Sequence, residues 1–341
     1  MQKLLTIVVP VYKVEPYINK CLDSCLIYKT NEQSEKVLDE DLMNQLEVII
    51  VNDGTPDRSA EMSREYVKRY PQTFRQIDKE NGGHGSAWNV GLKEATGKFL
   101  RFLDSDDWLT NLDRLMQDLM NCDADVVFSP FDTHYAMENK VDRTDSPITP
   151  NGKSVLIGKD MWGNSYKGWN AINFWSITYK TNILSPLYPL FAEKVMYDDY
   201  ILTWAPLVNG RVCVSYDYVV YNYLVGRPGQ SMSLTMQEKK ANFYWACFMQ
   251  FENVRRRIDE NKIPSDLLET IDRFIAGYAK FIMWYLAFLP FKESKSKIGY
   301  LWKTYLCGED KNKLLKRYKR LPFGLFYIVE HLRYKKNNWK N

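Results

Sequence analysis

Residues 79–109 read KENGGHGSAWNVGLKEATGKFLRFLDSDDWL, a glycine-rich turn followed by a predicted helix, a predicted strand and an acidic cluster. Gly82, Gly83 and Gly85 allow a ligand to approach the backbone closely, and the amino terminus of the following helix favours an anionic group. The acidic cluster comes directly after the apolar strand. Because ligands of mainly parallel sheets bind at the carboxyl ends of strands, this stretch predicts a binding site for an anionic ligand.

The acidic cluster contains Asp104, Asp106 and Asp107 within four positions. These carboxylates repel one another unless a cation or hydrogen-bond donors compensate them. A hard divalent ion, Mn²⁺ or Mg²⁺, is the simplest compensation, since such ions take one or two carboxylates and complete their shell with phosphate oxygens and water. The alternative is a helix N-cap before Trp108, and we assign that role to Asp107.

The residues around this stretch alternate between short β-branched runs and helical patterns. Strands alternating with helices imply a mainly parallel sheet flanked by helices, so the predicted fold class is α/β. The predicted strands are LLTIVV, LEVIIV, FRQI, KFLRFL and ADVVF. The predicted helices cover 14–28, 58–70, 85–95 and 111–121.

Two further strand ends carry polar or turn-forming residues. The first strand ends at Pro10, before Val11 and Tyr12, and the second ends in VNDGTPD, which places Asp53 beside a turn-forming glycine. A carboxylate at a strand end can accept a hydrogen bond from a base or a ribose. Asn-Asp-Gly is also an ordinary turn, so the context has to decide between the two readings.

The remaining chain divides into three kinds of segment. Residues 29–44 have no strong strand pattern and are predicted to be a surface excursion, and residues 131–159 to form a long loop or irregular hairpin. Strand-like runs between 174 and 223, with one helix over 198–208, complete the first domain. We therefore predict a domain over 1–230 and a helical region over 231–341.

Composition limits the class of protein and its setting. The six cysteines show no zinc-ligand spacing, which indicates reduced thiols and a cytoplasmic protein. The longest apolar stretch is too short to span a bilayer, and Pro10 interrupts the apolar start of the chain. Residues 311–341 hold ten Lys or Arg and one Glu, so the tail is strongly basic although the rest of the chain is acidic.

The motifs together resemble the family 2 inverting glycosyltransferases of GT-A fold. The shared elements are the VPVY strand end, the NDG turn, the NGG…N-x-G-L-x-x-A-x-G helix and the DSDDW cluster, in the family's order. The resemblance is strongest over about residues 4–110. It implies that Asp53 contacts the base, Asp104 the ribose or diphosphate, and Asp106 the metal. The residues it places at the nucleotide sugar are Pro10, Val11, Tyr12, Asp53, Asn81, Gly82, Gly83, His84, Asp104 and Ser105.

The resemblance also implies a catalytic base downstream of the metal motif. The family's acidic pair corresponds to MYDDYI, so Asp199 takes the position of the general base and Asp198 replaces the usual Glu. NYLVGRPGQSMS resembles the loop that closes over the diphosphate, where Arg227 can neutralise the leaving group. Each Asp is alternatively a helix cap.

The expected activity is inverting, metal-dependent transfer of one sugar from a nucleoside-diphosphate sugar, for which a UDP-sugar is favoured, to a hydroxyl of a glycan or lipid-linked glycan. The processive Gln-x-x-Arg-Trp pattern is absent. The basic tail either lies on an anionic membrane surface or docks on its own domain; nucleic acid is not expected. The rivals are a nucleotidyltransferase and a non-catalytic nucleotide- or membrane-binding protein.

Overall fold

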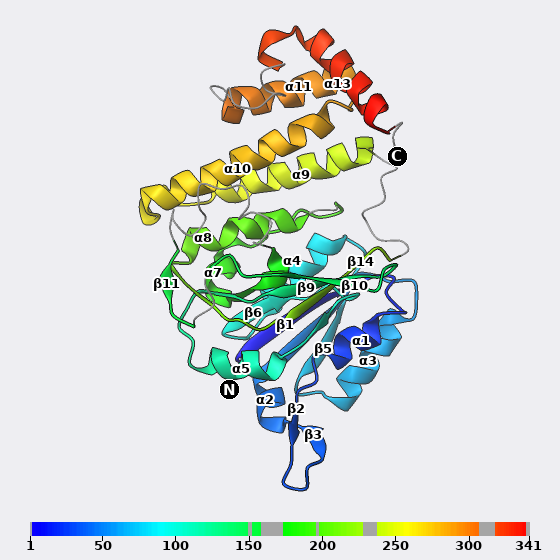
Figure 1. Cartoon of the computed structure of the whole chain (residues 1–341), viewed down its shortest axis with the longest axis vertical. Coiled ribbons are helices and arrows are strands. Elements are labelled where there is room, and N and C mark those ends of the chain that lie inside the picture. Colours follow the sequence, from blue (N-terminus) through cyan, green and yellow to red (C-terminus); the bar gives the residue numbers. More distant parts are fainter. Residues whose placement is uncertain are drawn as a thin grey trace.

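The computed structural model has the predicted α/β architecture, with a large sheet flanked by helices and a helical carboxyl-terminal region (Figure 1). It describes residues 2–148, 152–157, 173–195, 198–227, 237–306 and 318–338. The predicted boundary between residues 230 and 231 lies outside the described residues, so the division into two domains stays a prediction.

The main sheet has eight strands in the order β11-β13-β8-β12-β6-β1-β4-β5. Its centre is parallel: β1 (Leu5–Val11) pairs with β4 (Leu46–Asn52) on one side and with β6 (Phe99–Phe102) on the other. Every residue of β1 and β4 is buried, because helices cover both faces of these strands. The other strands of this sheet are β5 (Phe74–Asp78), β8 (Val126–Phe128), β11 (Val155–Leu156), β12 (Ile177–Lys180) and β13 (Val212–Ser215).

A second sheet of four strands has the order β10-β9-β14-β7. Its β9 (Phe131–Tyr135) and β10 (Lys140–Thr144) form an antiparallel hairpin, which is one of the two structures predicted for this segment. Strand β14 (Tyr221–Val225) pairs with β7 (Trp108–Leu109) and so brings the chain around residue 221 against the acidic cluster.

The helices of the α/β body agree with the predicted segments in position and differ in length. The segment predicted over 14–28 is helical only from Ile18 to Asp23, and the one predicted over 198–208 is a 3-10 helix followed by a short α-helix. The helices of the body are α1 (Ile18–Asp23), α2 (Glu40–Gln45), α3 (Ser59–Arg69), α4 (His84–Glu94), α5 (Leu112–Met120), η2 (Phe174–Ser176), α7 (Thr181–Leu184), η3 (Ser185–Leu187), η4 (Asp198–Thr203) and α8 (Ala205–Asn209).

The predicted surface excursion at 29–44 contains regular structure that the sequence did not indicate. Strands β2 (Tyr28–Thr30) and β3 (Lys36–Leu38) pair as a hairpin, which extends from the body at the end opposite the carboxyl-terminal helices (Figure 1). Most of the side chains of this hairpin are exposed, so neither strand has a face that is buried on the core. The alternation that identifies a half-buried strand was therefore missing from the sequence.

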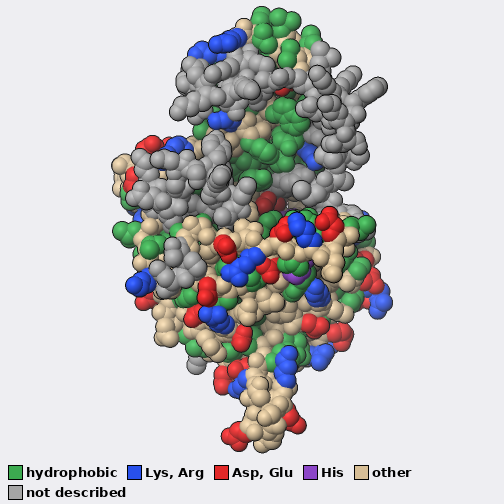
Figure 2. Space-filling view, viewed as in Figure 1, with side chains coloured by type: hydrophobic (Ala, Val, Ile, Leu, Met, Phe, Trp, Pro, Cys, Tyr) green, Lys and Arg blue, Asp and Glu red, His purple; other side chains and the backbone are tan. Residues whose placement is uncertain are grey.

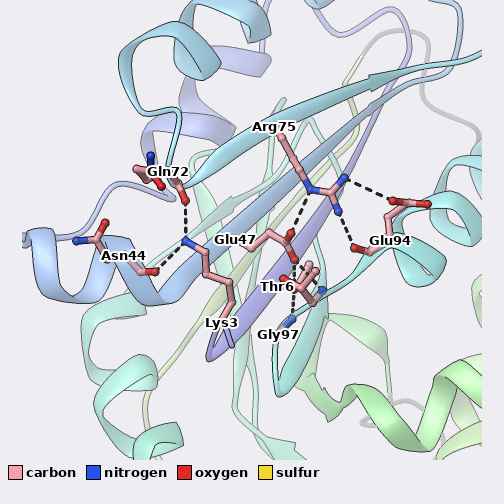
Figure 3. A network of polar contacts seen from close by, with 9 residues as sticks. Lys3, Thr6, Asn44, Glu47, Gln72, Arg75, Glu94 and Gly97 are labelled. Carbon is pink, nitrogen blue, oxygen red and sulfur yellow. Dashed lines mark hydrogen bonds and ion pairs between the residues drawn. The ribbon is translucent and has the colours of Figure 1, made fainter. Parts of the chain in front are cut away.

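A polar network joins β1, β4 and β5 near their amino-terminal ends (Figure 3). The buried Glu47 carboxylate accepts hydrogen bonds from Thr6 Oγ1 at 2.6 Å, from Arg75 Nε at 3.1 Å and from the backbone N–H of Thr96 at 2.9 Å. Lys3 donates to the backbone oxygens of Asn44 and Gln72 beside it. This network fixes the register of the strands at their amino-terminal ends, and the candidate site lies at the opposite, carboxyl-terminal ends.

The carboxyl-terminal region is helical, as predicted. Two long helices, α9 (Gln237–Arg256) and α10 (Ser265–Leu286), lie side by side across one end of the body, with α11 (Phe291–Leu301) and α13 (Phe323–Asn338) beyond them (Figure 1). The short helix η5 (Glu260–Lys262) lies between α9 and α10, and the π-helical turn η6 (Trp302–Leu306) directly follows α11. Among the described residues, no helix combines the length and apolar character needed to cross a bilayer.

The basic tail docks on its own chain through part of α13. The Phe326 side chain is fully buried, and the rings of Phe323 and Tyr327 pack against Phe291 of α11. Leu325 and Ile328, on the same helix, are about half exposed. One of the two alternatives for the tail is thus present, whereas contact with a membrane stays a prediction.

Candidate active site

The carboxyl ends of β1 and β4 form one wall of the candidate site. Pro10 and Val11 lie within β1 with buried side chains, and Tyr12, just beyond the strand, is 43% exposed. The backbone N–H of Asp53 donates to the Val11 carbonyl and holds the two strand ends together. Of the first three predicted residues, Tyr12 therefore presents the most side-chain surface to a ligand.

The Asp53 side chain is buried and organises the glycine-rich loop. Its carboxylate accepts hydrogen bonds from Lys79 Nζ at 2.6 Å and from the backbone N–H groups of Gly82 and Gly83 at 2.8 Å. The Asn81 amide also donates to Asp53. These bonds use the carboxylate within the chain, so the predicted contact with a base stays untested.

Helix α4 brings the downstream acidic pair to this loop. Asn89 accepts hydrogen bonds from the backbone N–H groups of Leu190 and Phe191 and donates to the Phe191 carbonyl. A side chain at Gly85 would clash with the Ala192 carbonyl and with the Asp198 carboxylate, which explains the need for glycine at this position. The helix and the segment before Asp198 are therefore in direct contact.

His84 connects the two acidic motifs. Its Nε2 lies 2.9 Å from Asp104 Oδ1, and its Nδ1 lies 3.1 Å from Asp198 Oδ1. Burial opposes the charged ring, but the charges and hydrogen bonds of Asp198 and Asp104 outweigh it and raise the pKa of His84 well above its ordinary value. The imidazolium form donates to both carboxylates, one 20 and the other 114 positions away along the chain, and so joins the two acidic motifs.

Two of the three cluster carboxylates are partly accessible. One ligand atom from each of Asp104, Asp106 and Asp107 can be chosen so that all lie within 4.8 Å of one another. Burial and the charge of Asp104 raise the pKa of Asp106, with Arg227 opposing the shift. Ser105, between the two accessible acids, is only 5% exposed.

The predicted N-cap role of Asp107 is wrong. The residues that follow it form β7, and Asn111 takes the N-cap position of α5. The Asp107 carboxylate is 1% exposed and accepts hydrogen bonds from the Tyr221 hydroxyl at 2.6 Å and the Leu224 backbone N–H at 2.7 Å. Asp107 therefore attaches β14 to the cluster, because a buried carboxylate needs donors from the surrounding structure.

Arg227 pairs with the cluster from the end of β14. Its guanidinium forms an ion pair with the Asp106 carboxylate, and it lies over the Tyr17 ring at 5.0 Å from the centroid. A cation thus faces the carboxylate that was predicted to bind a metal. The rest of the predicted closing loop, beyond residue 227, lies outside the described residues.

Asp199 and Asp198 have different environments at the start of η4. Asp198 is 3% exposed and bonded to His84, whereas Asp199 is only partly buried. Burial, with the charge of Asp198 next in size, raises the pKa of Asp199 to about 7, against the lowering effect of His84. A carboxyl with this pKa can accept and release a proton near neutral pH.

The structure brings the predicted acids together and adds two residues. Lys79 neutralises Asp53, and the Tyr221 hydroxyl accepts a hydrogen bond from the Asp104 N–H at 3.1 Å while donating to Asp107. Lys79 opens the quoted motif, so its position beside the glycines was an available signal. Tyr221 had no local signal, since its role depends on strand pairing.

Residues 6–174 match the family model described as Glycosyl transferase family 2. EpsJ of Bacillus subtilis, an uncharacterized glycosyltransferase, is 38% identical over 129 residues, which are 37% of this chain and 33% of EpsJ. EpsH of the same organism, a putative glycosyltransferase, is 25% identical over 292 residues, 82% of this chain and 76% of EpsH. The match to EpsJ thus spans only about a third of that relative's length.

Solved structures share the fold over nearly the whole chain. Staphylococcus aureus TarS, residues 1–349 in complex with UDP-GlcNAc, has a TM-score of 0.66 at 17% identity and covers 98% of this chain and 92% of its own. The mannosyltransferase PcManGT of Pyrobaculum calidifontis, in complex with GDP-Man and Mn²⁺, has a TM-score of 0.50 at 16% identity, covering 100% and 88%. At these identities the likeness establishes the fold alone.

Proposed function

We propose that this chain, whose residues 6–174 match the family 2 glycosyl transferase model, belongs to that family and transfers a single sugar from a nucleoside-diphosphate sugar to an acceptor hydroxyl with inversion. The observation that carries the proposal is the His84 bridge, because His84 lies within hydrogen-bonding distance of both Asp104 and Asp198. Such a site holds groups for binding a diphosphate beside a candidate base. A UDP-sugar is the favoured donor, since TarS of the same fold was solved with UDP-GlcNAc.

The cluster has the donor set that Mn²⁺ or Mg²⁺ prefers. Asp106, with Asp104 beside it, would hold the ion, because Asp107 already uses both oxygens on Tyr221 and Leu224. The pairing of Asp106 with the Arg227 guanidinium supports a place for a cation here. A bound divalent ion would neutralise negative charge on the diphosphate as it departs.

Arg227 is the chain's own cation for the leaving group. It lies at the end of β14, next to the cluster, and its planar guanidinium suits phosphate oxygens as well as the Asp106 carboxylate. When the ion and the donor are bound, Asp106 has a second partner. We therefore expect the guanidinium to turn from Asp106 to the diphosphate and to stabilise its departure.

Asp199 removes the proton of the acceptor hydroxyl. Its pKa of about 7 leaves a substantial ionised fraction at neutral pH, while burial keeps the carboxylate basic enough to receive the proton. Asp198 has a positioning role, since its carboxylate is buried on His84. Direct attack by the deprotonated hydroxyl on the anomeric carbon would invert its configuration.

The acceptor is proposed to be a glycan or lipid-linked glycan of the cell envelope. Relatives matched over part of the chain include the Bacillus subtilis minor teichoic acid biosynthesis protein GgaB, at 33% identity over 102 residues, which are 10% of GgaB. This short match supports the class of acceptor. The same proposal includes contact of the chain with a membrane surface during transfer.

The test is a donor screen with the full chain. UDP-, GDP- and dTDP-sugars are incubated with Mn²⁺ or Mg²⁺, and release of the nucleoside diphosphate is measured together with thermal stability. Release from one donor class, lost in Asp106→Asn, is expected. Pyrophosphate release from nucleoside triphosphates, or donor binding without turnover across a panel of acceptors, would refute the proposal.

A further inference from the structure

A cluster of aromatic rings extends from the proposed base onto the carboxyl-terminal helices. We call Tyr200, Tyr244, Tyr278, Phe281 and Tyr285 the aromatic surface. The Tyr200 ring of η4 lies 5.3 Å from the Tyr278 ring and 6.0 Å from the Phe281 ring. The Tyr244 ring of α9 lies 5.2 Å from Phe281 and 4.7 Å from Tyr285. The cluster therefore joins three elements.

The members from α10 share one face of that helix. Residues 278, 281 and 285 are separated by three and four positions, which places side chains one above another along a helix. Figure 2 shows hydrophobic side chains gathered in a hollow over α9 and α10, between the α/β body and the outer helices.

Part of the aromatic surface is open to solvent. Tyr200 is 37% exposed and Phe281 is 40% exposed, whereas Tyr278 beneath them is 4% exposed. Exposed aromatic rings that continue into a buried cluster are typical of a binding surface, since such rings are otherwise covered. The two exposed rings thus present faces that a ligand can cover.

The aromatic surface begins at the proposed base. Tyr200 directly follows Asp199 in η4. Burial, followed by the charges of neighbouring groups that include Asp199, raises the pKa of the Tyr278 hydroxyl. The Tyr200 end of the aromatic surface is therefore adjacent in the chain to the group proposed to receive the acceptor's proton.

We infer that the aromatic surface binds the saccharide part of the acceptor, with a sugar ring stacked on Tyr200 and Phe281. This inference rests on the proposed function and names where its second substrate binds. A pyranose has an apolar C–H face and a rim of hydroxyls, and the tyrosines offer both an apolar ring and a hydroxyl.

The experiment measures saccharide binding to the full chain by saturation-transfer NMR and titration. The probes are cellobiose, chitobiose and lactose, with farnesyl phosphate as the lipid probe. Phe281→Ala should weaken binding of the preferred saccharide roughly 3- to 10-fold, and Phe281→Tyr, which keeps the ring, should retain it. Phe291→Ala is the matched control, because Phe291 is 44% exposed and packs on α13 instead.

Each outcome separates this inference from the proposed function. Binding lost in Phe281→Ala, with thermal unfolding unchanged and binding retained in Phe291→Ala, supports the aromatic surface. The inference is overturned if no saccharide binds, if Phe281→Ala binds as the wild type does, or if only farnesyl phosphate binds. A chain that releases no nucleoside diphosphate from any donor refutes the proposed function, and saccharide binding still decides the inference.

Discussion

Replacing Asp199 by Asn should abolish transfer while making the folded protein more stable above neutral pH. The substitution preserves the size of the side chain and removes its ability to accept a proton. We expect kcat to fall by on the order of 10²–10⁴, the usual contribution of a general base. Donor binding should change little, because the donor is assigned to the Asp104 cluster and the glycine-rich loop.

The pKa of Asp199 sets the pH dependence of the wild type. With a pKa of about 7, roughly one tenth of the carboxyl is ionised at pH 6 and roughly nine tenths at pH 8. The rate should therefore rise about tenfold over this range if the ionised form is the base. Asp199→Asn should lose this rise, since its amide does not titrate.

As the pH rises, the stability of the wild type should fall while its rate of transfer rises. The folded-state pKa is raised from 3.8 to about 7, so the folded protein binds the proton more tightly and loses stability as pH rises between these values. Three pKa units correspond to at most about 4 kcal/mol, and partial exposure of Asp199 reduces this to about 1–2 kcal/mol. Asn removes the buried charge and recovers that amount.

The assay combines donor turnover from pH 6 to 8 with thermal unfolding of both proteins at pH 5 and pH 8. We expect the melting temperature of Asp199→Asn to exceed that of the wild type by a few degrees at pH 8 and to match it more closely at pH 5. Near-normal transfer by Asp199→Asn, with intact donor binding, would refute the assignment of the base. A variant less stable than the wild type at pH 8 would contradict the electrostatic reasoning.

Three further variants test other parts of the structure. Arg227→Gln should lower kcat roughly 10²-fold with little effect on unfolding, because it removes the positive charge that stabilises the departing diphosphate; a kcat equal to that of the wild type would exclude this role. Gly85→Ala should lower kcat at least about 10²-fold, because its new methyl group displaces the segment before Asp198. Gly324→Ala is the control, because no atom lies within 4 Å of a Cβ added there. Glu47→Ala should cost about 1–3 kcal/mol in urea unfolding at pH 7, because it leaves the buried Thr6 hydroxyl and the Thr96 N–H without their acceptor. Burial opposes the shift, but the hydrogen bonds to Glu47 lower its pKa below 4.5, so the difference should shrink as pH falls below this value; a constant difference would contradict the reasoning.

The sequence by itself determined the fold class and the strand ends at which the candidate site lies. Apolar runs such as LEVIIV are legible because a strand buried on both faces contains consecutive apolar residues. The glycine-rich turn and the acidic cluster are local patterns as well. Both patterns depend on residues close together in the chain. Residues 79–109 were therefore sufficient to predict a helix, a strand and a binding site for an anionic ligand.

Tertiary structure decided how the polar residues are used. Asp107 resembled a helix cap in the sequence, but β14 crosses the cluster and supplies its donors from residues 114 and 117 positions away. Asp198 resembled a partner of the base, and in the fold it is buried on His84. A local pattern fixes which hydrogen-bonding groups a residue carries, whereas the partners that satisfy them arrive only when distant segments pack. For that reason the sequence named the members of the candidate site, and the structure alone showed their contacts.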